Sequence, residues 1–90
     1  MEIVTAGVID WFVLKRIAKK WAIDQRSRLA DPKTNPADVE ADISWKVAVN
    51  DVKYDLSFDQ REELLKLVMD ESGMTALKER QLALLERRVG

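Results

Sequence analysis

The chain has 90 residues and no cysteine or histidine, and its 15 basic and 16 acidic side chains give a formal net charge of −1. This composition excludes disulfides, thiolate or imidazole metal ligands, and acid–base catalysis by histidine. With 47% hydrophobic and 34% charged residues, it is typical of a folded protein, and the length predicts one small domain over residues 1–90.

Residues 3–14 form an almost uninterrupted apolar run, and Lys15 and Arg16 follow it. A secretory signal peptide carries its positive charge before the apolar run. A membrane-spanning helix needs roughly 20 apolar residues, whereas this run is shorter and contains Asp10. We therefore expect a cytoplasmic protein without a membrane span.

The first predicted element is a helix over residues 5–29, which Asp31 and Pro32 end. Its broad apolar stripe is expected to face the core, and it consists of Val4, Trp11, Leu14, Ala18, Trp21, Ala22 and Leu29. Four cations lie on the opposite side: Lys15, Arg16, Lys19 and Lys20.

Three further apolar residues, Val8, Ile9 and Phe12, fall on the cationic side, so the first three turns are apolar nearly all round. Such a helix needs cover on both sides, from another segment of the chain or from a partner. Insertion at a membrane surface is a third alternative, which Asp10 opposes. We expect a partner, either a second copy or another protein, to contact Val8, Ile9, Phe12, Lys15, Arg16, Lys19 and Lys20.

The middle segment has two competing interpretations. Asn35 and Pro36 are a good helix start, but apolar residues then alternate with polar ones over residues 43–49 and again over 52–58. Two such runs joined by Asn50 and Asp51 predict a β-hairpin. A helix over residues 36–52 would instead form one stripe from Ala41, Trp45, Ala48 and Val52. The β-branched and aromatic content favours the hairpin.

The last third is predicted to be two helices, over residues 58–71 and 75–89. Ser57 and Gln60 resemble a capping box, Gly73 suits the left-handed position that ends a helix, and Thr75 can cap the next one. We expect the two to fold back as a helical hairpin. The fold class is therefore predicted as α+β and predominantly helical, with an all-α four-helix bundle as the alternative.

The charge is unevenly distributed: residues 1–30 carry a net charge of +3, residues 31–72 carry −6 and residues 73–90 carry +2. This pattern suits internal neutralisation or association between copies. The composition offers no usual set of catalytic side chains, and we expect no cofactor and no metal site. We therefore predict a non-enzymatic protein–protein interaction module that self-associates through its first helix. Adaptors, inhibitors and assembly factors encoded by phages or mobile elements are often of this size.

Nucleic-acid binding is the alternative function. The helix pair 58–71 and 75–89 has the outline of a helix-turn-helix, and the basic cluster of the first helix could contact phosphates. However, Glu79 and Glu86 dilute the basic charge of the second helix of the pair, and the helix before it is acidic.

Overall fold

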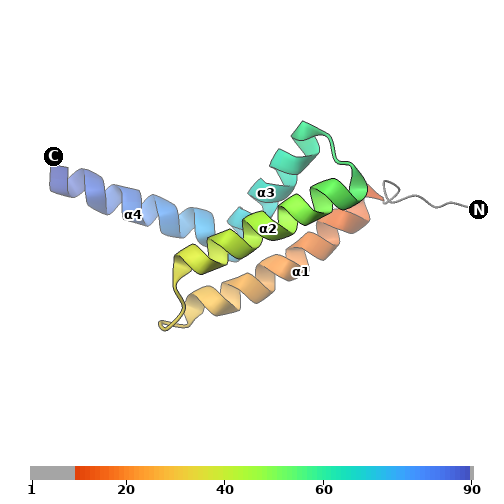
Figure 1. Cartoon of the computed structure of the whole chain (residues 1–90). Coiled ribbons are helices and arrows are strands. Elements are labelled where there is room, and N and C mark those ends of the chain that lie inside the picture. The colour runs from red at the N-terminus through yellow and green to blue at the C-terminus, as the bar shows by residue number, and fades with distance from the viewer. Residues whose placement is uncertain (1–9, 90) are drawn as a thin grey trace, which may run out of the picture.

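The computed structural model describes residues 10–89, which form four α-helices (Figure 1). These are α1 (Trp11–Ala30), α2 (Pro36–Tyr54), α3 (Phe58–Ser72) and α4 (Met74–Val89). Helices α1, α2 and α3 pack together as a three-helix bundle, while α4 leads away from it (Figure 1). The molecule is consequently elongated, with extents of 60 × 26 × 18 Å.

The predicted hairpin over residues 43–58 is wrong, because these residues form most of α2, a short connection and the start of α3, and no strand occurs among residues 10–89. The α+β class is therefore replaced by an all-α architecture. Positive φ occurs at Asp55, which ends α2 with φ 49°, and not at Asn50 or Asp51. The apolar residues that alternate over residues 43–49 therefore belong to a helix with two apolar faces.

Most of the helix boundaries follow from local chemistry that the sequence already showed. The Asn35 side chain accepts a hydrogen bond from the Ala37 N–H, and Pro36 occupies the first position of α2. Ser57 and Gln60 form the predicted capping box. The first helix, predicted from residue 5, begins instead at Trp11, because Asp10 is extended and its carboxylate caps α1 by accepting from the Phe12 N–H at 2.8 Å. Each cap satisfies a backbone donor that has no partner inside its helix.

The core lies between α1, α2 and α3. Its buried residues come from every helix at helical spacing, and they are Leu14, Ala18, Ala22, Val39, Ile43, Val47, Leu64, Val68 and Met74. The small residues Ala18 and Ala22 are completely buried on α1, which allows close approach of neighbouring helices. The predicted stripe of the first helix is confirmed for its described members, whereas Val4 lies outside the described residues.

Helix α4 does not fold back along α3, so the predicted helical hairpin is also wrong (Figure 1). Gly73 does adopt the expected left-handed conformation, with φ 88° and ψ 0°, but it is the only residue between the two helices. Thr75 does not cap α4, which begins at Met74. The start of α4 contacts the bundle through the buried Met74, the half-buried Leu77 and the ion pair between Lys78 and Glu40 of α2.

Candidate interaction surfaces

A groove of about 520 Å³ runs between α1 and α3 on the surface of the bundle. One wall comes from α1 and consists of Phe12, Lys15, Arg16 and Lys19. The other wall comes from α3 and consists of Glu63, Lys66, Leu67 and Asp70. The groove therefore combines an apolar lining with cations on one side and mixed charges on the other. An amphipathic segment has the chemistry to fill such a groove.

Four of the seven residues predicted to contact a partner line this groove, namely Phe12, Lys15, Arg16 and Lys19. Phe12 leaves 69% of its surface exposed. Lys20 is exposed on α1 but does not line the groove. Val8 and Ile9 lie outside the described residues. The groove residues of α3 were not predicted, because only the tertiary packing places α3 beside the cationic face of α1.

Lys15 bridges the two walls of the groove. Its Nζ atom lies 3.2 Å from Oε2 of Glu63 on α3 and is 5.1 Å from the centre of the Phe12 ring. One acidic contact to the basic face of α1 thus forms within the chain. Among residues 10–89, Arg16 and Lys19 form no salt bridge, so their charges remain available to another molecule.

A second uncovered surface is the apolar face of α4. The side chains of Leu82, Leu84 and Leu85 are each more than half exposed, and every residue from 81 to 88 is classed as exposed. No contact with a protein partner was predicted on this helix, because the expected helical hairpin would cover these leucines with the preceding helix. The predicted helices over residues 58–71 and 75–89 left three residues for a turn, whereas in the structure Gly73 alone joins α3 and α4.

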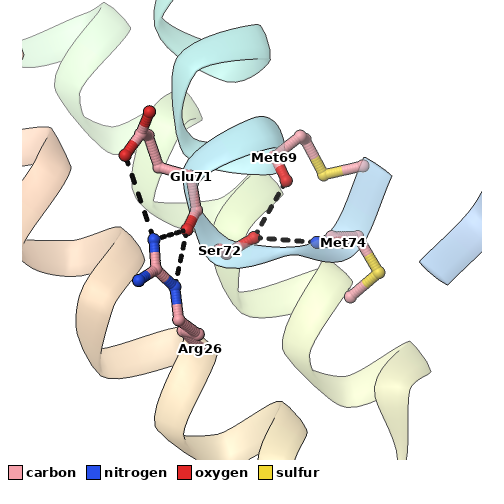
Figure 2. Close-up of polar contacts among 5 residues, drawn as sticks. All are labelled: Arg26, Met69, Glu71, Ser72 and Met74. Atoms are coloured by element: carbon pink, nitrogen blue, oxygen red, sulfur yellow. Dashed lines mark hydrogen bonds and ion pairs between the residues drawn. The ribbon is translucent and has the colours of Figure 1, made fainter. Parts of the chain in front are cut away.

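The start of α4 is held firmly at its junction with α3 (Figure 2). The Ser72 hydroxyl donates to the Met69 carbonyl at 3.1 Å and accepts from the Met74 N–H at 3.3 Å. Arg26 of α1 donates to the Glu71 carbonyl, with its Nε atom at 3.0 Å (Figure 2). These contacts fix where α3 ends and in which direction the chain leaves it.

Two further contacts outside Figure 2 hold the first turns of α4. Lys78 pairs with Glu40 of α2, with 2.6 Å between Nζ and Oε2. The Thr75 hydroxyl donates to Oδ1 of Asp70 at 2.7 Å. This hydrogen bond, together with that from Lys66, lowers the pKa of Asp70 below its ordinary value. The pKa of Lys66 is raised by the same pairing with Asp70.

The outward side of α2 carries a third apolar surface. Trp45 and Val52 are 70% and 83% exposed, and Val49 lies between them on the same stripe. Trp45 and Val52 belong to the stripe predicted for the helical alternative, but the core face of α2 is instead Val39, Ile43 and Val47. The helix is therefore apolar on two opposite sides, one of which is uncovered.

Among residues 10–89, no three metal-ligating side chains come together in a group that could hold an ion. In the same part of the chain, each helix is too short or too polar to cross a lipid bilayer. No protein-family model, curated protein or solved structure matches the chain. The exposed apolar surfaces and the groove are therefore the features from which a function is argued.

Proposed function

We propose that the protein is a non-enzymatic protein–protein interaction module whose partner is a second copy of itself. The exposed leucine face of α4 is the observation that carries this proposal. Isolated helices of fewer than about 12–15 residues are marginal in water, and helices in proteins gain most of their stability by packing an apolar face. The distal half of α4 has such a face, and in the part of the chain that the structure describes its leucines remain more than half exposed.

The groove between α1 and α3 is a second surface that supports self-association. Phe12 and Leu67 provide apolar surface, and Arg16 and Lys19 provide charges that no described residue neutralises. A nucleic-acid partner has less support. A helix-turn-helix needs a turn of three or four residues, whereas one residue joins α3 and α4. In addition, Lys78 on the second helix of that pair is occupied by Glu40.

Sedimentation velocity from low to high micromolar concentration tests the proposal. We expect the wild type to dimerise with rising concentration, and Phe12→Asp to weaken dimerisation without loss of helical circular dichroism. Ile23→Asp is the matched control, because Ile23 is exposed on α1 but does not line the groove. A wild type that stays monomeric throughout this range would contradict the proposal.

A further inference from the structure

We infer that the occupant of the α1–α3 groove is helix α4 of a second copy, and that two chains exchange this helix reciprocally. This inference rests on the proposed self-association and specifies which surfaces meet. Each chain would then complete a four-helix bundle with the partner's α4. Because the exchange is mutual, the same two surfaces are used twice around a two-fold axis and the assembly closes as a dimer.

Helix α4 cannot reach the groove of its own chain. Gly73 alone separates it from α3, and Ser72 and Arg26 hold the junction (Figure 2). The Lys78–Glu40 pair directs the first turns of α4 toward α2, whereas the groove lies between α1 and α3. Short connections of this kind favour exchange of an element between chains over closure within one chain.

The width of the apolar face of α4 suits a site between two helices. At 100° per residue, Leu77 and Leu84 lie at one edge and Leu82 at the other, so the face spans about 160° of the helix. A seam between two helices needs only a narrow stripe, while a face this wide suits a helix lying against two others. The walls of the groove come from two helices, which meets that requirement.

The groove and the uncovered part of α4 also agree in length. Along α1 the groove extends from Phe12 to Lys19, and along α3 it extends from Glu63 to Asp70. Each wall therefore measures about two helical turns at 1.5 Å per residue. The uncovered part of α4, residues 81–88, has the same length. The exposed surface and the groove are consequently matched in extent.

The charges beside the apolar face of α4 complement the α1 wall of the groove. Along one edge of its apolar face α4 carries Glu79 and Glu86, and along the other it carries Arg80 and Arg87. The α1 wall of the groove is cationic, and its Arg16 and Lys19 form no salt bridge among residues 10–89, whereas on the α3 wall Glu63 and Asp70 are paired with Lys15 and Lys66. One direction of the docked helix places its glutamates on the α1 wall and its arginines on the α3 wall. The opposite direction places like charges together, so electrostatics selects one orientation.

The closing experiment mixes two full-length variants that are each defective on one surface. Leu82→Glu with Leu85→Glu removes the apolar face of α4 but leaves the groove, and Phe12→Asp damages the groove but leaves α4. We expect the double variant to raise the dimer dissociation constant by at least about 100-fold, because two apolar side chains are lost from each of the two contacts. The matched control is Ala76→Glu with Ala83→Glu, which adds the same charge to exposed positions on the opposite face of α4.

Mixing the two defective variants should produce a heterodimer, because one intact α4 meets one intact groove. A heterodimer in sedimentation velocity, with both variants monomeric alone, is the expected result. If α4 paired with α4 instead, Phe12→Asp would dimerise alone and the mixture would gain nothing. That outcome would overturn the exchange while leaving the proposed self-association intact, whereas a monomeric wild type would contradict the proposed self-association itself.

Charge reversal tests the orientation separately. Glu79→Lys with Glu86→Lys should weaken dimerisation about 10-fold, an effect that added salt should imitate. Arg16→Glu with Lys19→Glu should do the same, and all four changes in one chain should restore dimerisation. Failure of the combined variant to recover would overturn the predicted orientation of α4 in the groove.

Discussion

The three-helix bundle and the projecting α4 contain similar apolar residues, but they differ in how far these residues are exposed to solvent. In the bundle, Leu14 and Leu64 are at most 1% exposed, whereas Leu82 and Leu84 in α4 are each 58% exposed. The hydrophobic effect stabilises a structure only in proportion to the apolar surface that is removed from water. The same residue type therefore stabilises the fold in one region and remains available for association in the other.

The largest expected effect compares one substitution in the two regions. Leu64→Ala should lower the free energy of unfolding by about 2–5 kcal/mol, because it leaves a cavity in a packed core. Leu84→Ala should change it by no more than about 0.5 kcal/mol, since the side chain is exposed in the monomer. Urea unfolding at a concentration low enough to keep the chain monomeric checks both. Equal losses would mean that α4 is covered by its own chain.

A smaller effect is expected at the junction between the two regions. Gly73 has φ 88°, and a Cβ built there would meet no atom within 4 Å. The cost of Gly73→Ala is therefore conformational and should be about 1 kcal/mol. Asparagine tolerates this conformation better, so Gly73→Asn should cost less in the same urea measurement. A stabilising alanine would show that the backbone at residue 73 is not left-handed.

The smallest effect concerns the pH dependence of the junction. Because hydrogen bonds from Thr75 and Lys66 lower the pKa of Asp70 in the folded state, ionised Asp70 stabilises the fold at neutral pH. This contribution is present above the ordinary pKa of 3.8 and is lost as the pH falls through the lowered folded value. Asp70→Asn should therefore flatten the decline of the melting temperature in acid.

The control for this prediction is Asp24→Asn, which removes an exposed carboxylate of α1 that is far in sequence from the junction. Thermal melts between neutral pH and about pH 2 compare the two variants with the wild type. If Asp70→Asn and the wild type lose melting temperature in parallel, the contacts of Asp70 do not contribute to stability.

The error over α2 shows why one pattern can support two structures. Ile43, Trp45, Val47 and Val49 alternate with more polar residues, which on a strand would place all four on one face. On a helix, residues two apart point in nearly opposite directions. Ile43 and Val47 consequently enter the core, while Trp45 and Val49 face solvent. The alternation cannot distinguish these cases unless the position of α1 and α3 is known.

The chain by itself determined the features that depend on near neighbours in sequence. Asn35 with Pro36 starts α2, Ser57 with Gln60 starts α3, and Gly73 ends α3, because caps act over about one turn. The apolar stripe of α1 was equally local, since helical periodicity places Leu14, Ala18 and Ala22 on one side. Four of the residues predicted to bind a partner do line one groove, but their role in binding stays a prediction.

Only the tertiary structure decided which apolar face is covered and by what. Residues of α3 form half of the groove because that helix packs beside α1, a contact between segments about 50 residues apart. The direction of α4 depends on Arg26, Ser72 and Glu40, which come from three different helices. Burial depends on the simultaneous position of all helices, so local patterns cannot determine it, and the leucines of α4 remain exposed although their spacing is typical of a core helix.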